Sequence, residues 1–296
     1  MTTIALIGFG EVGQTLADDL LALGQTRLIA WDIKFAEADS LPVMAARNRP
    51  PVQVARSAAE AVAQADWVIC AVTAAADLDA AAAVAEGIGE GTPYLDLNSA
   101  SPGTKQAAAA MIDAGGGSYL EAAVMAPIAP RRIASPILLG GARARELAPR
   151  LDALGFVGVR AYADTVGPAS ATKMCRSVMI KGIEALLAES MLAARHYGVE
   201  DDVLNSLSDL LPVGDWHKLA RYMISRSIEH GVRRAEEMRE VARTVQEAGI
   251  EPWMTRACVE RQEWAPRHWA ALEHETIAPF LDAMRAQTPK AGETGA

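Results

Sequence analysis

Short apolar runs and helical apolar repeats alternate along the first half of the chain. Residues 4–7 have the length and composition of a buried strand, and Leu16, Leu20 and Leu23 then recur at helical spacing. Strands are expected at 4–7, 28–31, 52–54, 67–72, 94–97, 119–120, 136–139 and 156–159. Helices are expected from Ser57, at 75–87, from Ser101 and near 143–154. This alternation predicts an α/β fold with a mostly parallel, doubly wound sheet.

The strand pattern stops near Asp164. From there to about Phe280 the apolar positions have helical periodicity, and residues 167–197 are expected to form one long helix. Breaks between helices are expected at Gly198, Pro212–Gly214, Gly231 and Gly249–Pro252. The polar tail, 287–296, is expected to be disordered. We therefore predict a sheet domain at 1–164 and an all-helical domain at 165–296.

Composition and charge exclude several classes of function. The chain has 296 residues, a net charge of −9 and a pI near 5.2, which gives no electrostatic support to a nucleic-acid role. The three cysteines form no C-x-x-C pair, and this favours a reducing cytoplasm over a disulfide framework. The first strand begins too early for a signal peptide, and no apolar run is long enough to cross a membrane.

The first apolar run leads directly into a G-x-G-x-x-G turn. The turn comprises Gly8, Phe9, Gly10, Glu11, Val12 and Gly13. In a dinucleotide site Gly8 would permit the tight turn, Gly10 would let a pyrophosphate approach the backbone, and Gly13 would let helix and strand pack closely. Free N–H groups at the start of the helix would face the anion. The alternative is a glycine-rich turn that binds no ligand.

An acidic residue follows the second apolar run. Asp32 stands at the distance from Gly8 at which a carboxylate binds the adenosine ribose hydroxyls. This favours NAD as the cofactor, because a carboxylate repels the 2′-phosphate of NADP, whereas the nearby Lys34 keeps NADP possible. Val72 and Thr73, at the end of another expected strand, are candidates for contact with the middle of the cofactor.

The long helix at 167–197 carries a narrow polar stripe. At 3.6 residues per turn the stripe falls within an arc of roughly 60°. Its members are Ser170, Lys173, Ser177, Lys181 and Glu184. A helix that is otherwise apolar is buried, so the stripe should face a wet cavity or a polar partner. The alternative is a surface helix with a Lys181–Glu184 ion pair.

With these motifs the chain resembles the beta-hydroxyacid dehydrogenase superfamily, which includes 6-phosphogluconate and 3-hydroxyisobutyrate dehydrogenases. Residues 8–24 match its first motif, 96–102 its D-x-S-T-x-x-P element, and 167–173 its G-x-G-x-x-x-K motif. The resemblance implies an N-terminal Rossmann domain, an all-helical C-terminal domain joined to it by a long helix, and a homodimer formed through the helical domain. It also implies that Lys173 is the catalytic lysine.

The chain departs from the family pattern at several positions. Ser177 replaces the asparagine one turn after the lysine, and Met125 and Pro127 replace a serine and a glycine of the substrate loop. Arg131 and Arg132 could supply an anion contact instead, or could form an exposed loop pair. A lysine–aspartate pair of the family corresponds to Glu236–Glu237. The chain is more similar to a little-studied branch called phosphogluconate dehydrogenase-like, and phosphogluconate is not transferred as the substrate.

The resemblance suggests hydride transfer between nicotinamide and a hydroxy acid. Lys173 would act as the general acid or base, which requires burial to lower its pKa toward ~7–8. Ser177, Asn98 and Ser99 would orient the substrate, with Asn98 also near the cofactor. Lys181, about 12 Å further along the helix, would bind a distal anionic group or form a surface salt bridge. Met125 would lie at the substrate.

Two other classes of function remain open. An imine or ketone reductase with a bulkier, less anionic substrate would suit Met125 and the many tryptophans, although the imine reductases lack a lysine at position 173. The altered substrate loop would suit a sensor that binds a dinucleotide but catalyses no reaction. The histidines form no metal spacing, so no metal is expected. His230, Arg233 and Arg234 could line the far wall of the site or brace helices, and the tryptophans could serve the core or a dimer contact.

Overall fold

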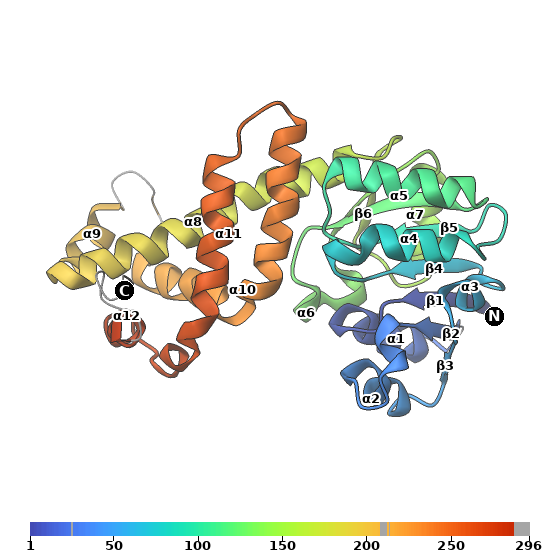
Figure 1. Ribbon diagram of the computed structural model, residues 1–296, viewed down its shortest axis with the longest axis horizontal. Coiled ribbons are helices and arrows are strands. Elements are labelled where there is room, and N and C mark those ends of the chain that lie inside the picture. Colours follow the sequence, from blue (N-terminus) through green and yellow to red (C-terminus); the bar gives the residue numbers. More distant parts are fainter. Residues whose placement is uncertain (25, 208–211, 213, 287–296) are drawn as a thin grey trace, which may run out of the picture. The chain divides into compact units, whose positions relative to one another are not determined.

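The computed structural model describes residues 1–24, 26–207, 212 and 214–286 (Figure 1). The chain divides into two compact units, Met1–Cys175 and Arg176–Ala296. The predicted disordered tail and most of the segment 208–213 lie outside the described residues.

The N-terminal unit is built on an eight-stranded sheet in the order β3-β2-β1-β4-β5-β6-β7-β8. The strands are β1 (Thr2–Ile7), β2 (Thr26–Trp31), β3 (Val52–Val54), β4 (Trp67–Cys70), β5 (Pro93–Asp96), β6 (Ser118–Val124), β7 (Ile137–Gly140) and β8 (Val159–Ala163). Neighbouring strands are parallel except for the antiparallel pair β6–β7. The predicted mostly parallel sheet is therefore confirmed.

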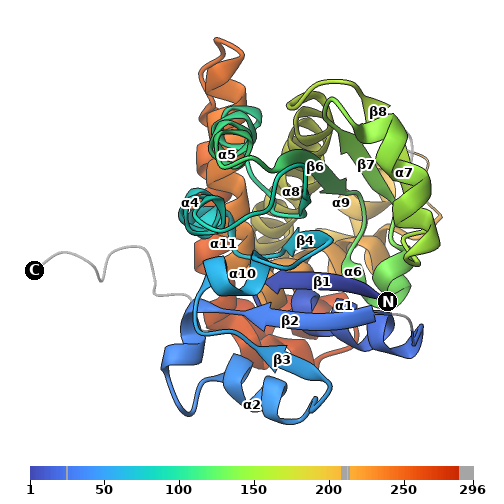
Figure 2. The same cartoon turned by 90° about the vertical axis from the view of Figure 1, so that its right-hand side faces the viewer.

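Helices cover both faces of this sheet. The α-helices of the unit are α1 (Glu11–Ala22), α2 (Leu41–Arg47), α3 (Ala58–Val62), α4 (Asp77–Ala85), α5 (Pro102–Ala114), α6 (Ile128–Arg131) and α7 (Ala144–Ala153). Short 3₁₀ helices are η1 (Ile33–Ala36), η2 (Ala74–Ala76) and η3 (Arg132–Ala134). Leu16 of α1 and Leu147 of α7 belong to the core on one face, and Ala81 of α4 and Ala108 of α5 to the core on the other. Figure 2 shows α4 and α5 side by side, and the two cores confirm the doubly wound architecture.

The C-terminal unit is helical, and among its described residues no strand occurs. The elements are α8 (Pro168–Tyr197), which begins in the first unit, α9 (Glu200–Leu207), α10 (Trp216–Glu247), α11 (Trp253–Trp264), the 3₁₀ helix η4 (Ala265–Glu273) and α12 (Ile277–Ala286). Their apolar side chains form one core, and α10 packs along α11 (Figure 1). In the described part of the chain we find no helix with the length and apolar character that a bilayer span requires.

Two sequence predictions about the elements are wrong. The apolar run 156–159 does not form a strand, because Phe156 is buried in the core after a turn at Gly155, and β8 begins only at Val159. Gly231 does not break a helix, because α10 continues through it. A Cβ atom on Gly231 would lie 2.3 Å from the carbonyl oxygen of Gln262, so this glycine allows close packing between helices.

Candidate functional site

Four strands of the sheet end at the same edge. Trp31 of β2 lies beside Ile7 of β1, and Ile7 lies beside Cys70 of β4. Cys70 in turn lies beside Asp96 of β5. The loops that follow these four residues therefore leave the sheet together. Ligands of open α/β sheets bind at this carboxyl edge.

The glycine turn after β1 has the geometry that the sequence motif requires. Gly8 has φ of +92°, and a Cβ atom there would lie 2.4 Å from the carbonyl oxygen of Ala71. A Cβ atom on Gly13 would lie 2.2 Å from the carbonyl oxygen of Gly8, so the start of α1 packs directly on the turn. Around the Cβ position of Gly10, in contrast, there is no atom within 4 Å. The chain thus packs tightly at Gly8 and Gly13 and leaves open space at Gly10, which fits a pyrophosphate.

The start of α1 offers backbone N–H groups to an anion. Gly10 occupies the N-cap position, and no side chain caps the helix there. Glu11 is exposed and Val12 is half-buried. The side chain of Phe9 is fully buried against Phe35 and is therefore not available to a ligand. The unpaired donors and the open space fit a dinucleotide at this turn.

The Asp32 carboxylate links the glycine turn to the end of β2. Its Oδ2 atom accepts a hydrogen bond from the backbone N–H of Phe9 at 2.7 Å, and its Oδ1 atom accepts one from the N–H of Lys34 at 2.9 Å. An ionised carboxylate has about four acceptor positions. Asp32 therefore keeps acceptor capacity for two ribose hydroxyl groups while it holds the turn in place.

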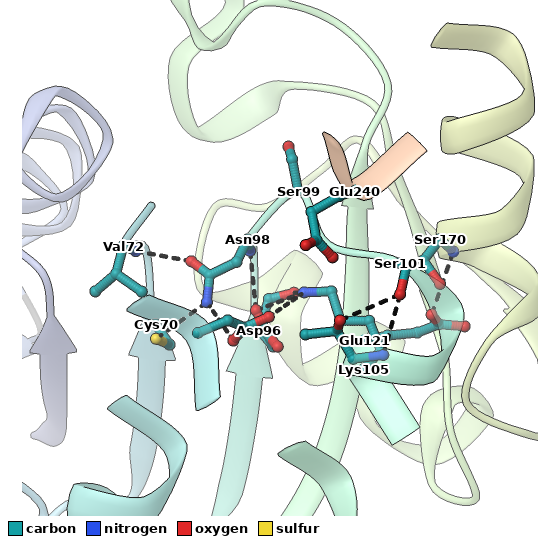
Figure 3. Close-up of polar contacts among 12 residues, drawn as sticks. Cys70, Val72, Asp96, Asn98, Ser99, Ser101, Lys105, Glu121, Ser170 and Glu240 are labelled. Carbon is teal, nitrogen blue, oxygen red and sulfur yellow. Dashed lines mark hydrogen bonds and ion pairs between the residues drawn. The ribbon is translucent and has the colours of Figure 1, made fainter. Parts of the chain in front are cut away.

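The loops after β4 and β5 are tied together by the side chain of Asn98 (Figure 3). Its Oδ1 atom accepts a hydrogen bond from the N–H of Val72 at 2.7 Å, and its Nδ2 atom donates to Oδ1 of Asp77 at 2.8 Å. Thr73 is exposed at the N-cap of η2, whereas Asn98 is buried. The amide group of Asn98, which the sequence assigned to the cofactor and the substrate, is thus engaged by the protein itself.

A buried cluster of charged and phenolic groups lies beneath these two loops. The Lys105 ammonium lies 2.6 Å from Oδ1 of Asp96 and 3.8 Å from Oδ2 of Asp77, and all three side chains are at most 2% exposed. The hydroxyl group of Tyr119 donates to Oδ2 of Asp96 at 2.5 Å. The Asp96 carboxylate also accepts from the N–H of Asn98 at 2.9 Å. The cluster therefore joins α4, α5, β5 and β6 at the base of the candidate site.

The buried setting shifts the pKa values of these groups. Burial raises the pKa of Asp77 to about 7 against the attraction of Lys105, and it raises the pKa of Cys70 to about 12. Although burial opposes it, the carboxylates of Asp96 and Asp77 raise the pKa of Lys105, so this lysine stays charged. Sequence reasoning missed Asp77 and Lys105. The available signal was the position of Lys105 on the apolar face of a predicted helix.

Another buried carboxylate anchors the start of α8. Glu121 of β6 is fully buried, and its Oε1 atom accepts hydrogen bonds from the N–H groups of Gly167 at 2.8 Å and Ala169 at 3.0 Å. Its Oε2 atom accepts one from the N–H of Ser170 at 3.2 Å. Glu121 therefore caps the helix that carries Lys173. The sequence signal for this role was an acidic residue inside an apolar strand.

The structure brings two of the predicted site residues together. The Nζ atom of Lys173 donates a hydrogen bond to Oγ of Ser99 at 2.6 Å. Ser99 follows β5 directly after Asn98, and both Ser99 and Lys173 are half-buried. Lys173 is therefore positioned through its backbone by the anchored helix and through its ammonium group by the loop after β5.

The polar stripe continues into the C-terminal unit, where it meets α10. Lys181 forms an ion pair with Glu237 at 2.5 Å, and Glu184 forms one with Arg234. Burial lowers the pKa of Lys181 and raises the pKa of Glu184. The alternative of a surface helix with a Lys181–Glu184 pair is wrong, because both side chains are buried and are paired with α10 instead. Ser177 is half-buried on α8, one turn after Lys173.

The loop after β6 contributes an apolar side chain. Met125 is half-buried and packs against a small core that contains Leu138 and Ala169. Arg132 is held by an ion pair with Asp19 of α1 at 2.8 Å, whereas Arg131 is exposed. Arg132 therefore holds the loop against α1, and its positive charge is already paired with Asp19.

The tryptophans and histidines of the C-terminal unit differ in their burial. Trp216 is buried in the core, whereas Trp253 and Trp269 are largely exposed. His268 is buried against Trp264, and burial lowers its pKa to about 4. Within the described ranges we find no group of three or more His, Cys, Asp or Glu side chains that could hold a metal ion.

Comparison with known proteins agrees with this geometry. Residues 3–157 match the family described as the NAD binding domain of 6-phosphogluconate dehydrogenase. Residues 194–265 match a domain of unknown function, DUF1932. The sequence therefore joins a known dinucleotide-binding domain to a helical segment whose role has not been assigned.

Solved structures with a similar fold cover nearly the whole chain. A conserved hypothetical protein from Sinorhizobium meliloti 1021 is 39% identical, with 97% of both chains covered and a TM-score of 0.75. The conserved protein MTH1747, described as structurally similar to 3-hydroxyacid dehydrogenases, is 29% identical over 97% of this chain and 99% of its own, with a TM-score of 0.68. The 3-hydroxyisobutyrate dehydrogenase of Mycobacterium tuberculosis is 20% identical over 97% and 99% of the two chains, with a TM-score of 0.71, and shares the fold.

Proposed function

This chain belongs to the family built on the NAD binding domain of 6-phosphogluconate dehydrogenase, and we propose that it catalyses hydride transfer between a nicotinamide dinucleotide and a hydroxy acid. When bound, the nicotinamide would supply the hydride chemistry. The rest of the site would bind the two reactants, orient them and handle the proton. The family supports the coarser assignment, a dinucleotide-dependent oxidoreductase, and the residues around Lys173 support the finer one.

The observation that carries this proposal is the contact between Lys173 and Ser99 at the carboxyl edge of the sheet. In the oxidation the carbinol C–H bond breaks with loss of hydride, the hydroxyl proton passes to a neutral Lys173 amine, and a carbon–oxygen double bond forms. In the reduction the Lys173 ammonium returns this proton to the oxygen. Ser99 would hold the amine and orient the substrate oxygen, and Ser177 would add a second hydroxyl group.

We propose NAD as the preferred cofactor because of Asp32. Its carboxylate lies at the end of β2 and keeps acceptor positions for the ribose hydroxyls. The same negative charge would repel a 2′-phosphate. Lys34 follows two residues later, and its ammonium could support NADP as a secondary cofactor.

The substrate is proposed to be a small anionic molecule, with Lys181 as a candidate for its distal group. Lys181 is already paired with Glu237, so a substrate carboxylate would have to share or displace that partner. Met125, with its apolar packing, favours the alternative of a ketone or imine reductase with a bulkier substrate. An anionic substrate would thus use the charge of Lys181, whereas a bulkier, less anionic substrate would use the apolar contact of Met125.

A panel of hydroxy acids, ketones and cyclic imines separates these functions. Turnover would be followed with NAD, NADH and their phosphorylated forms by the absorbance of the reduced nicotinamide. The expected result is oxidation of a hydroxy acid, with turnover about 10²- to 10⁴-fold lower in Lys173→Ala. Turnover of imines alone would favour the reductase, and tight cofactor binding with no turnover of any class would favour a dinucleotide sensor.

A homodimer formed through the C-terminal unit is part of the proposal. Met179 and Leu186 of α8 and Trp253 and Met254 of α11 are largely exposed. A groove of about 510 Å³ between α8 and α11 adjoins Leu186 and Met254. Exposed apolar side chains around such a groove are typical of a subunit interface, and a second copy of the chain would cover them.

Light scattering tests the dimer, with Leu186→Glu as the disrupting variant and Glu260→Gln as a control at the same groove. A monomeric mass for the unmodified protein would contradict the dimer.

For the compartment we propose the cytoplasm, since the three cysteines, Cys70, Cys175 and Cys258, form no C-x-x-C motif.

A further inference from the structure

Asp77 has an unusual position for a carboxylate at the start of a helix. It is the first residue of α4, where acidic side chains are normally exposed to water, yet it is 0% exposed. Its Oδ1 atom accepts the hydrogen bond from Asn98 Nδ2, whereas its Oδ2 atom has no hydrogen-bond partner and lies 3.8 Å from the Lys105 ammonium. One of its two oxygens is thus buried without a donor.

The bond from Asn98 to Asp77 extends to both loops at the carboxyl edge of the sheet. The other end of the Asn98 amide accepts from the N–H of Val72, so the residue that leads into Thr73 is fixed by Asn98. The chain then continues from Asn98 into Ser99, which holds Lys173. Asp77, Asn98 and Val72 therefore form one continuous hydrogen-bonded connection, and Figure 3 shows its bond between Val72 and Asn98.

We propose that Asp77 is a positioning residue for the dinucleotide, and that the charge on its carboxylate sets how firmly Asn98 holds the loops at Val72 and Ser99. The proposal rests on the dinucleotide site described above and adds a control of its affinity. A hydrogen bond to an ionised carboxylate is stronger than one to a neutral carboxyl group. Ionised Asp77 would therefore hold the loops more firmly, and the cofactor would bind more tightly.

The surroundings of Asp77 place its ionisation near neutral pH. Charged and titratable side chains face it from three strands and one helix. They are Cys70 of β4, Tyr94 and Asp96 of β5, Tyr119 of β6 and Lys105 of α5. Burial and the charge of Asp96 favour the protonated carboxyl group, whereas the charge of Lys105 opposes it. The pKa of Asp77 lies at about 7 as a result.

The N-terminal unit, Met1–Cys175, has no histidine that could gain or lose a proton near neutral pH. All five histidines of the chain, His196, His217, His230, His268 and His274, follow Cys175. Burial keeps the pKa of Cys70 near 12, and burial likewise raises that of Tyr119 well above its ordinary value. Lys173 is the other candidate in this pH range, so a dependence of cofactor affinity on pH between about 6 and 8 would point to Asp77 where Asp77→Asn abolishes it.

The test measures the dissociation constant of NADH by calorimetry between about pH 6 and pH 8.5. For the unmodified protein we expect affinity about fivefold higher at the alkaline end, as a twofold stronger hydrogen bond implies. Asp77→Asn keeps the shape and the acceptor oxygen but removes the charge, so its affinity should be low and independent of pH. The matched control is Asp79→Asn, which removes an exposed charge from the same helix and should behave like the unmodified protein.

A second variant covers the case in which Asp77→Asn does not fold. Asn98→Ala leaves Asp77 in place but breaks its connection to Val72, so affinity should fall and the dependence on pH should disappear. The proposal is overturned if NADH binds with no dependence on pH, or if Asp77→Asn keeps the dependence of the unmodified protein. If neither NADH nor NADPH binds at any pH, the dinucleotide site itself is refuted. Tight binding with an affinity that does not change with pH would instead refute only the role of Asp77.

Discussion

The Nζ atom of Lys173 lies 2.6 Å from Oγ of Ser99, although the two residues are 74 positions apart in the sequence. Ser99 follows β5, and Lys173 lies on the second turn of α8, whose first turn is capped by Glu121. The proton donor proposed for the reaction is therefore fixed at both ends of its side chain. This arrangement makes Lys173 the most direct test of the proposed chemistry.

Replacement of Lys173 by alanine should reduce turnover without weakening cofactor binding. A positioned general acid or base contributes about 10²- to 10⁴-fold to the rate, so kcat should fall by that factor with any substrate the unmodified enzyme turns over. The dissociation constant of NADH should stay unchanged, because the glycine turn is intact. Lys218→Ala, which removes an exposed lysine of α10, is the control. Ordinary turnover in Lys173→Ala would remove the proton-transfer role.

Replacement of Glu121 by alanine should destabilise the N-terminal unit. The change leaves the N–H groups of Gly167, Ala169 and Ser170 without their buried acceptor. Each unpaired buried donor costs about 1–3 kcal/mol, so the free energy of unfolding should fall by about 3 kcal/mol or more. The melting temperature of Glu121→Ala, compared with that of the exposed-site variant Glu86→Ala, measures this effect. Equal melting temperatures for the two variants would argue against the capping role.

Asp77 should make the protein less stable as the pH rises. Its pKa is raised by burial from 3.8 to about 7 in the folded state, so the folded protein binds this proton more tightly than the unfolded chain does. The stabilising contribution is fully present below about pH 4 and is lost as the pH rises through about 7, a change of up to about 4 kcal/mol. Asp77→Asn should therefore melt at a higher temperature than the unmodified protein at pH 8.

The same comparison at lower pH provides the control. At about pH 4 the Asp77 carboxyl group is protonated in the folded protein and is only about half ionised in the unfolded chain. The side chain is then neutral in the folded form of both the unmodified protein and Asp77→Asn, so the two melting temperatures should nearly coincide. Thermal unfolding followed by circular dichroism at the two pH values measures the difference. A loss of stability in Asp77→Asn that is equal at both pH values would show that the charge of Asp77 does not determine its effect.

Replacement of Asp32 by alanine should change the preference between cofactors. The variant loses the acceptor for the ribose hydroxyls, and a hydrogen bond to a charged group contributes about 1.5–3 kcal/mol. NADH should therefore bind about 10- to 100-fold more weakly, whereas the affinity for NADPH should stay the same or increase. Calorimetric titration of both cofactors into Asp32→Ala and into the exposed-site control Asp39→Ala checks this. Equal losses for NADH and NADPH would mean that Asp32 acts only by holding the turn.

The parts of the fold that depend on local patterns could be predicted from the sequence. The glycine turn, the apolar strands and the long helix at 168–197 each follow from residues that are close together in the chain. Ser101 caps α5 and Pro102 occupies its first position, as the dipeptide indicates. Local chemistry determines these features, so the doubly wound sheet and the helical second half were accessible without a structure.

The features that depend on distant partners could not be predicted. Lys181 and Glu184 share one face of α8, which suggested a pair, but their partners Glu237 and Arg234 lie more than 45 residues away. Gly231 appeared as a break because a local pattern does not reveal that the backbone of Gln262 packs against it. The cluster of Asp77, Asp96 and Lys105 likewise joins three elements that only the folded sheet brings together.

Thermal unfolding with and without NADH, in the unmodified protein and in Gly10→Val, shows whether a dinucleotide binds at the glycine turn. The space around Gly10 is open, so the valine should leave the melting temperature of the free protein unchanged while it blocks the pyrophosphate. NADH at about 100 times its dissociation constant adds about 2.7 kcal/mol, and the unmodified protein should melt roughly 2–10 °C higher. Gly10→Val should show no shift. The same shift in both proteins, or none in either, would contradict a dinucleotide site at the glycine turn.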